Sequence, residues 1–405
     1  MRRRAGWMVA CALLFIVSAV QAQSLRRIAF LPFEAEQAND QWLGHLVADL
    51  ADRAMATNTL ADVPDANQRA RGRLKMRISY LDAAVRDPSA AAAALDLDLV
   101  GRGWVRTEGS QAIFDLELIE IDAGTRLLAQ SFRGPAADPT EVALNIASRC
   151  SEAVYGAPLL AYASQVVRPL PLRVGVLEAF GQGLASLDAA GGAASTSDVR
   201  AQSRELIAAS NNLASVVNSQ PDLLWPYDAL MEASSAIIEL DPSVSAAYVN
   251  IGIAQAALGD LQGAVSILRQ GRRMAESDPT VRLALANYLL DLAARGSIRR
   301  EGLLEEARAA AGEATALAPE SQSAWVMLGA AAFDASDYEA ASEAYQRAVD
   351  LDPADPVCRL GLGLALVRLG LWEEARPHLE ATLELDPAGP YGRRAEGELD
   401  RTALP

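Results

Sequence analysis

The carboxy-terminal half of the chain repeats one alternation of helical patterns and prolines. Three helical stretches share the same ending, Leu-Asp-Pro, at 240–242, 351–353 and 385–387. Because the residue before proline avoids helical geometry, each proline marks the end of a helix, and the leucine is expected to close the apolar stripe of that helix. The prolines that separate the stretches lie 37, 40, 34 and 34 residues apart, at Pro242, Pro279, Pro319, Pro353 and Pro387.

Two helices repeated every 34 residues resemble the tetratricopeptide repeat, and the residue types fit. One unit carries the expected tryptophan, leucine, glycine, alanine, aromatic residue and proline in order, at Trp325, Leu328, Gly329, Ala341, Tyr345 and Pro353. The next unit has Arg359 in the tryptophan position, followed by Leu362, Gly363, Ala375, Leu379 and Pro387. The small residues let paired helices approach closely, and the large ones fill the space between them. The resemblance implies an all-α superhelix that binds proteins or peptides.

We predict four repeats, over 243–279, 280–319, 320–353 and 354–387. Degenerate repeat-like helices are expected ahead of them, over 201–242. A capping helix with a polar outer face is expected over 388–405.

The amino-terminal part changes pattern several times. An apolar strand at 28–33 precedes an amphipathic helix at 40–57, a second helical stretch at 65–77 and an alanine-rich one at 88–95. Three strands are expected next, at 99–106, 111–121 and 126–132, and a helix closes the part at 139–155. In the middle strand apolar and acidic residues alternate, as in a sheet with one wet face: Phe114, Asp115, Leu116, Glu117 and Leu118. The order predicts an α+β layer structure with an antiparallel meander.

This part, over 24–160, resembles the amino-terminal domain of the periplasmic TolB protein. The similarity rests on the Ile-Ala-Phe-Leu-Pro-Phe strand at 28–33, the helix after it, and the Leu-Val-Gly-Arg-Gly-Trp-Val-Arg strand at 99–106. Related modules precede helical repeats in larger bacterial regulators. The propeller of TolB has no counterpart in the sequence.

The segment 161–200 is predicted to be a linker with an irregular first helix. Residues 165–171 contain two prolines, and Ala189–Ser197 is rich in glycine, alanine and serine. We expect the latter stretch to form a flexible loop.

Residues 1–22 have the pattern of a secretory signal peptide. Three arginines precede an apolar run from Trp7 to Val20, and the small residue Ala22 fits a cleavage site. Fourteen apolar residues are short for a membrane span, so an uncleaved inner-membrane anchor is the lesser alternative. Cys11 lies too early in the run for lipidation. The mature protein is therefore expected to be periplasmic or secreted.

Composition and charge narrow the choice of partners. Apolar residues make up 51% of the chain and charged residues 22%, which is typical of globular domains. The formal charge of −16 would repel phosphate backbones, so no nucleic-acid partner is expected. Cys150 and Cys358 lie in different predicted domains. Two buried free thiols are the favoured interpretation, and a disulfide between them is the alternative.

Nothing in the sequence points to catalysis, a metal or a cofactor. The two histidines, His45 and His378, are far apart, and ordinary surface or packing roles are favoured for both. The Gly101–Trp104 stretch lacks the lysine and the following helix of a phosphate loop. Acidic pairs such as Glu305 and Glu306 fit solvated helix faces.

Binding to a protein is the favoured function. In tetratricopeptide arrays the first helix of each repeat lines a concave groove, and the candidates here are Val249, Asn250, Ile253, Asn287, Leu290, Val326, Phe333, Leu360, Leu364 and Arg368. Each apolar candidate has the alternative role of packing between repeats. The few cations argue against a clamp for a terminal carboxylate, so an apolar peptide or helix fits better.

The sequence thus predicts an exported, non-enzymatic scaffold that binds an envelope protein or peptide. The alternative is a structural component of an outer-membrane secretion or assembly complex, because the amino-terminal fold is also similar to that of curli-secretion proteins. A hydrolase or cyclase is the third and least favoured possibility.

Overall fold

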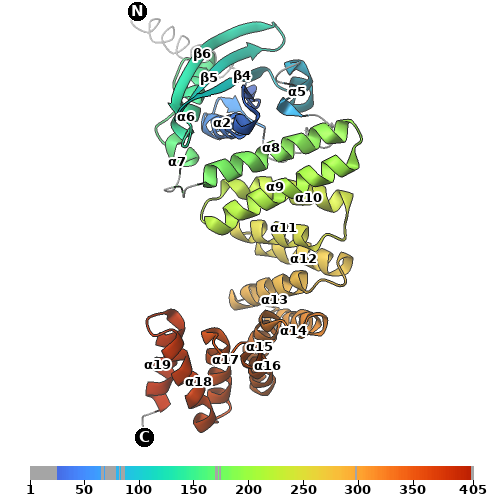
Figure 1. Ribbon diagram of the computed structural model, residues 1–405, viewed down its shortest axis with the longest axis vertical. Helices are drawn as coiled ribbons and strands as arrows, with labels where there is room; N and C mark the ends of the chain where they lie inside the picture. Colours follow the sequence, from blue (N-terminus) through green and yellow to red (C-terminus); the bar gives the residue numbers. More distant parts are fainter. Residues whose placement is uncertain are drawn as a thin grey trace, which may run out of the picture. The chain divides into compact units, whose positions relative to one another are not determined.

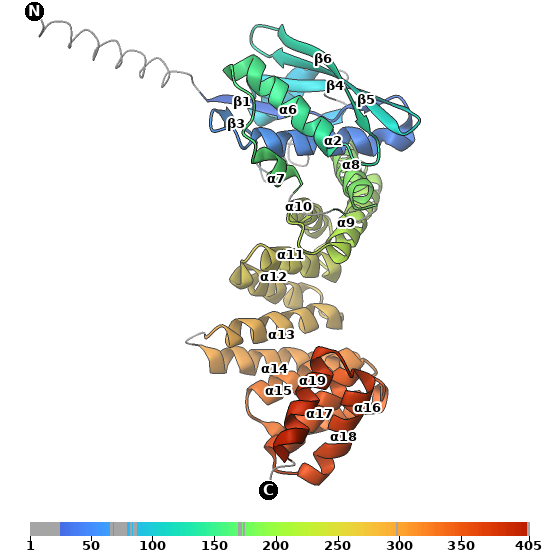
Figure 2. The ribbon, with the colours of Figure 1, turned by 90° about the vertical axis from the view of Figure 1, so that its left-hand side faces the viewer.

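The computed structural model describes residues 25–64, 68, 79–81, 83, 87–168, 172, 175–296 and 299–402. The chain divides into two compact units, Met1–Ala236 and Ile237–Pro405, each treated by itself (Figures 1 and 2). The predicted signal peptide with Cys11, and nearly all of the predicted helix at 65–77, lie outside the described residues.

The first unit contains a mixed sheet. Its strands are β1 (Arg26–Phe30), β2 (Glu34–Ala35), β3 (Ala61–Asp62), β4 (Leu99–Glu108), β5 (Gln111–Glu120) and β6 (Thr125–Pro135). The order is β3-β1-β4-β5-β6, with β2 also paired to β4. Strands β4, β5 and β6 form the predicted antiparallel meander. In addition, β1 runs parallel to both β3 and β4, a pairing that the sequence pattern did not predict. The long connection between β1 and β4 is what permits parallel pairing.

Helices cover the sheet on the side that the strand alternation predicts. The helices of this part are the short 3-10 helix η1 (Ala38–Asp40), α2 (Gln41–Met55), α5 (Pro88–Leu95), α6 (Thr140–Tyr155) and α7 (Ala163–Val167). Helices α2 and α6 pack against each other, and α6 contacts β6 (Figure 2). The ring of Phe114 in β5 meets that of Phe33 edge to face at 5.6 Å. On the other face of β5, Glu117 receives hydrogen bonds from Arg102 and Arg126.

The loop predicted at 189–197 is wrong, whereas a first helix is present within 161–200 as expected. Helix α8 (Val176–Ser195) runs through most of the expected loop at 189–197, and it packs against α9 (Val199–Ser219) and α2. Small residues on α8 let α9 lie close, since a β-carbon on Gly183 would sit 2.7 Å from Cγ of Leu213. The stretch that looks flexible in sequence is therefore a packing surface. Helix α10 (Trp225–Leu240) follows α9.

A buried carboxylate fixes α8 to the amino-terminal part of the first unit. Asp188 is 2% exposed. It accepts hydrogen bonds from the backbone N–H of Tyr80 at 2.8 Å and of Leu81 at 3.1 Å, and from Oγ of Ser79 at 2.7 Å. His45, also buried, places Nε2 3.6 Å from Oδ2 of Asp188. These contacts compensate the cost of burying the charge.

The second unit is a row of helices in pairs. Its members are α11 (Ser245–Ala257), α12 (Leu261–Met274), α13 (Pro279–Ala294), α14 (Arg300–Leu317), α15 (Gln322–Asp334), α16 (Tyr338–Leu351), α17 (Pro356–Arg368), α18 (Trp372–Leu385) and α19 (Pro390–Thr402). Each helix packs on the next one along the chain, as Figure 1 shows for α15 to α19. One pair of helices corresponds to each of the four predicted repeats.

A glycine in each of three first helices allows its partner helix to approach. A β-carbon on Gly252 would lie 3.0 Å from Leu268, one on Gly329 2.9 Å from Tyr345, and one on Gly363 2.7 Å from Leu379. In each pair the large residue follows the glycine by 16 positions. At Gly329 and Gly363 a β-carbon would force the partner side chain to shift, and at Gly252 the contact would be tight, so glycine favours the close approach in all three pairs.

The prolines between repeats also accept a recurring hydrogen bond. The carbonyl oxygen of Pro242 accepts from the Tyr248 hydroxyl at 2.9 Å, and that of Pro319 from Trp325 Nε1 at 2.8 Å. Arg359 Nε donates to Pro353 at 2.6 Å, so arginine replaces the tryptophan as a donor. Asp241 and Asp352, which precede two of these prolines, each accept from the N–H two residues on, that of Ser243 and of Ala354.

Two of the three leucines of Leu-Asp-Pro differ from the prediction, whereas Leu240 is half-buried. Leu351 is 37% exposed and Leu385 44% exposed. They therefore lie at the solvent edge of their helices instead of inside the apolar stripe. The last buried contact of α16 is one turn earlier, at Ala348 and Val349.

Replacing Asp188 with alanine is expected to loosen α8. Loss of its three hydrogen bonds leaves the backbone N–H groups of Tyr80 and Leu81 buried without an acceptor, at a cost of about 2–4 kcal/mol. Hydrogen–deuterium exchange of peptides from 176–195 should become faster by a corresponding factor. Asp122→Ala, at an exposed turn, serves as the control, and unchanged exchange in Asp188→Ala would refute the anchoring role.

Two glycine substitutions should change stability in opposite directions. Gly329→Ala pushes a methyl group into the Tyr345 ring and should destabilise the second unit by about 1–3 kcal/mol. Gly312→Ala, in α14, meets nothing within 4 Å and should stabilise by up to about 1 kcal/mol because alanine favours helix. Urea denaturation followed by circular dichroism measures both. Equal effects of the same sign would contradict the packing argument.

Candidate functional site

The predicted groove residues divide into three groups. Val249, Asn250 and Ile253 on α11, Leu290 on α13, and Val326 and Phe333 on α15 are half-buried. Asn287 and Arg368 are exposed, whereas Leu360 and Leu364 are buried. Helical periodicity places Val249 with Ile253, and Val326 with Phe333, on common faces of their helices. We call Val249, Ile253, Leu290, Val326 and Phe333 the first-helix stripe.

The candidates on α17 belong to the core. Helix α19 packs on both α17 and α18. Leu360 and Leu364 form one buried cluster with Ala395 of α19, and Leu399 packs against it. We therefore assign both leucines to packing between helices, the alternative role that the sequence leaves open. The stripe of partly accessible apolar side chains thus extends over α11, α13 and α15.

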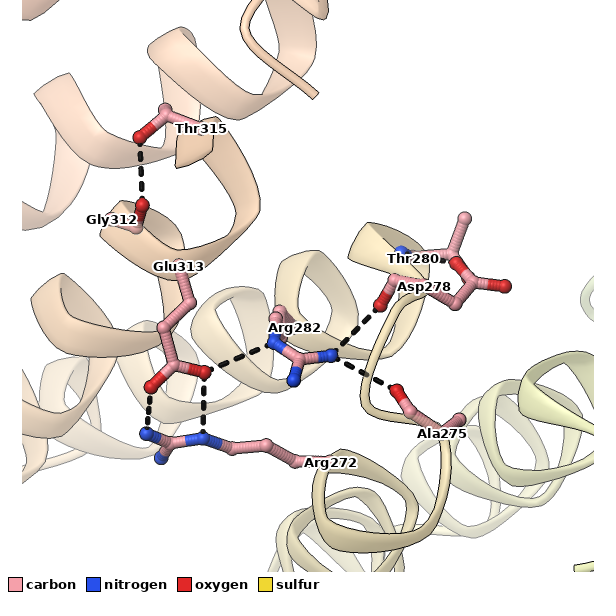
Figure 3. A network of polar contacts seen from close by, with 8 residues as sticks. All are labelled: Arg272, Ala275, Asp278, Thr280, Arg282, Gly312, Glu313 and Thr315. Atoms are coloured by element: carbon pink, nitrogen blue, oxygen red, sulfur yellow. Dashed lines mark hydrogen bonds and ion pairs between the residues drawn. The ribbon is translucent and has the colours of Figure 1, made fainter. Parts of the chain in front are cut away.

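Ion pairs between successive second helices brace the repeats. Arg269 on α12 binds Glu306 on α14 through two hydrogen bonds, of 2.8 and 2.6 Å. Arg272 on α12 likewise binds Glu313 on α14, which also accepts from Nε of Arg282 on α13 at 3.0 Å (Figure 3). These contacts hold neighbouring repeats in a fixed register.

Arg282 is the buried member of this network. Its side chain is 8% exposed. Besides Glu313, it donates from Nη1 to the carbonyl oxygens of Ala275 and Asp278, both at 3.0 Å (Figure 3). Those carbonyls lie in the turn between α12 and α13, so Arg282 connects that turn to α14. Asp278 in turn accepts from the N–H of Thr280 at 2.8 Å and caps α13.

A hollow lies on the second-helix side of the last repeats. Its volume is about 1000 Å³. The apolar lining consists of Trp325, Leu328, Ala332, Ala340, Ala344, Leu362 and Leu366. The polar lining consists of Arg308, Ser342, Glu343, Gln346, Arg347, Asp350, Glu374 and His378. We call this the second-helix hollow, and none of the ten predicted groove residues lines it.

Sequence reasoning missed the hollow because it followed the first helices alone. A signal is present in the sequence: Ala332, Ala340 and Ala344 are small residues at positions that face the hollow. Such residues leave space wherever no large side chain lies opposite. The residues opposite these alanines belong to other helices, and the spacing of residues along the sequence does not show which side chains those helices place there.

The histidine and cysteine side chains, which could take part in chemistry, do not form a common site. His45 is buried beside Asp188 in the first unit, whereas His378 is half-buried in the hollow of the second. Burial, with the nearby Arg359, lowers the pKa of His378. Burial raises the pKa of the Cys150 and Cys358 thiols to about 12 each, so both stay protonated at neutral pH. The Gly101–Trp104 stretch lies within β4.

In the part of the chain that the structure describes, no group of three or more histidine, cysteine, aspartate or glutamate side chains is arranged to hold a metal ion. No helix there is long and apolar enough to cross a membrane.

Comparison with known proteins identifies the repeats. Residues 299–356 and 332–399 each match a family model described as tetratricopeptide repeat. Tetratricopeptide repeats therefore occupy residues 299–399. No curated protein matches the chain.

Several solved structures are similar at low identity. MamA from Desulfovibrio magneticus RS-1 is 21% identical with a TM-score of 0.36, over 45% of this chain and 97% of that one. TTC0263 from Thermus thermophilus is 19% identical with a TM-score of 0.39, over 47% and 98%. YrrB, described as a TPR protein with an unusual peptide-binding site, is 19% identical with a TM-score of 0.36, over 48% and 91%.

The ion pair between Arg269 and Glu306 predicts that the stability of the fold depends on pH. Hydrogen bonds from Arg269 hold the pKa of Glu306 below its ordinary value of 4.5, although burial opposes this. A carboxyl with a lowered pKa stabilises the fold above its unfolded-state pKa, and this contribution is lost as pH falls through the folded-state value.

Glu306→Gln should therefore cost up to about 1 kcal/mol at pH 7, because the pair is partly exposed. Below pH 4.5 the stabilities of the variant and the wild type should converge. Urea unfolding across this range measures the difference, with exposed Glu305→Gln as control. A constant difference between variant and wild type at every pH would contradict the assignment.

Proposed function

We propose that this protein is an exported bacterial scaffold, without catalytic activity or cofactor, that binds a segment of a cell-envelope protein on its tetratricopeptide repeats. Tetratricopeptide proteins mediate protein–protein interactions, and this class of function fits repeats at 299–399. The signal-peptide pattern of residues 1–22 supports export to the periplasm or beyond.

The first-helix stripe is the observation that carries the proposal. Its five apolar side chains are each only half-buried and come from three successive first helices. An amphipathic helix or apolar peptide laid across them would bury the remaining apolar surface, which is the driving force of groove recognition. Asn287, exposed on α13, lies among them and can hydrogen-bond to a partner's backbone.

The stripe favours an apolar segment over a free carboxylate. Arg368 is the one cation among the ten predicted groove residues, and it lies on α17, beyond the stripe. A terminal carboxylate bound beside the stripe would therefore lack charged donors to replace its water, and burying it would cost several kcal/mol. Apolar side chains meet no such penalty.

The first unit serves in this proposal as a module that docks a second partner. The resemblance to the amino-terminal domain of TolB is the reason for this assignment. The β1 strand, the α2 helix after it and the β4-β5-β6 meander support that resemblance. The scaffold would then connect two envelope proteins.

Affinity capture from the native envelope tests the stripe. The tagged mature chain should retain its partner, and Phe333→Glu or Ile253→Glu should reduce the captured amount about tenfold or more, because a buried charge would face the partner's apolar side chains. Quantitative mass spectrometry measures the yield. Leu360 and Leu364 are unsuitable for this test, since charges there would disrupt the core. Because Phe333 packs against the same cluster and against Tyr338, thermal melting must show that Phe333→Glu folds as the wild type does.

Leu385→Glu is the matched control. It places the same charge on an exposed leucine of the same unit, outside the stripe. Capture that is equally strong with all three variants would refute the proposed function.

A further inference from the structure

The second-helix hollow lies over the core of the last repeats: Ala332, Ala344, Leu362 and Leu366 beneath it are buried, whereas Trp325, Leu328 and Ala340 remain partly accessible. Ala340 and Ala344 lie on one face of α16, and Ala332 of α15 adds a third small side chain. Around them stand larger apolar groups: Trp325, Leu328, Leu362 and Leu366. The indole N–H of Trp325 is already bonded to Pro319, so its ring is fixed in place. A volume of about 1000 Å³ can take several side chains of a partner.

The shape of the hollow suits a helix. Its lining follows α16 from Ala340 to Asp350, which corresponds to about 15 Å at 1.5 Å per residue, or three turns. Alanines at the contact permit helix axes to approach to about 8 Å. A helical segment of a partner could therefore lie beside α16 with its apolar face on the floor.

The charges around the hollow are predominantly acidic. Glu343, Asp350 and Glu374 stand against Arg308 and Arg347. Arg308 is neutralised by an ion pair with Asp337 at 2.7 Å. Within the described part of the chain, neither Glu343 nor Glu374 makes an ion pair, and both are exposed. The rim therefore attracts positive charge and repels negative charge.

One buried polar atom also faces no partner. Nδ1 of His378 is buried and makes no hydrogen bond within the described residues. Because His378 lines the hollow, a donor on a bound segment, such as a lysine ammonium or a serine hydroxyl, could reach it. Most buried polar atoms are paired with the protein or with an ordered water, so this atom is available to one or the other.

We propose that the second-helix hollow binds a basic amphipathic helix of a partner protein, with its apolar side chains on the floor around Trp325 and its lysines or arginines against Glu343 and Glu374. This site is distinct from the first-helix stripe and does not depend on it. A chain with both sites would hold two segments at once, one on each side of the repeats.

Two designed helical peptides of about 15 residues provide the probes. One combines leucine with lysine, the other leucine with glutamate, and each carries a fluorescent label for anisotropy titration against the full mature chain. We expect the lysine peptide to bind at least about tenfold more tightly than the glutamate peptide, with an affinity that falls as salt rises.

Charge reversal at the rim is the decisive variant. Glu343→Lys combined with Glu374→Lys should weaken the lysine peptide about tenfold and strengthen the glutamate peptide. Glu380→Lys, on the same helix as Glu374 but outside the hollow, should change neither. If the double variant behaves like Glu380→Lys, the proposal is wrong.

Filling the floor gives an independent test. Ala340→Leu, at a partly accessible lining position, places a larger side chain into the hollow and should abolish binding of the lysine peptide, while thermal melting verifies that the variant folds. Phe333→Glu, on the first-helix stripe, should leave peptide binding unchanged. If Phe333→Glu abolishes binding and Ala340→Leu does not, the peptide occupies the stripe, which overturns this inference and leaves the proposed function standing.

Discussion

The close approach of the two helices within each repeat is the constraint on which the second unit depends. It is set by Gly252, Gly329 and Gly363, each packed against a large side chain of the partner helix. Because the two helices of a repeat bury the faces that they turn toward each other, binding to a partner is left to their other faces. The first-helix stripe and the second-helix hollow both lie on such faces.

Much of this fold can be predicted from residues that act locally. The prolines at 319, 353 and 387 lie between helices, and a glycine with a large residue 16 positions later belongs to one helix pair, so the repeats at 320–353 and 354–387 are visible in sequence. The meander is equally local, because alternation in β5 and the turns beside it specify neighbouring strands. The parallel pairing of β1 is not visible, because it joins residues about 70 positions apart.

The misses share a physical cause, namely contacts between segments distant in the sequence. Glycines and alanines of α8 indicate a loop when read alone, yet α9 and α2 turn them into a buried face, and Asp188 finds its donors more than 100 residues earlier. Leu360 and Leu364 look like groove residues until α19 covers them. The second-helix hollow likewise exists only because of what lies opposite three alanines.

The hydrogen bond to the proline carbonyl has a consequence for how such repeats diverge. Tyrosine, tryptophan and arginine all serve as donors at this position, in Tyr248, Trp325 and Arg359. An aromatic ring is therefore not required at this position, whereas a side chain long enough to donate to the proline carbonyl is present in all three repeats. Substitution by phenylalanine would lose the donor, whereas arginine retains it. A repeat can thus depart from the usual tryptophan and still keep the contact that ties its first helix to the preceding proline.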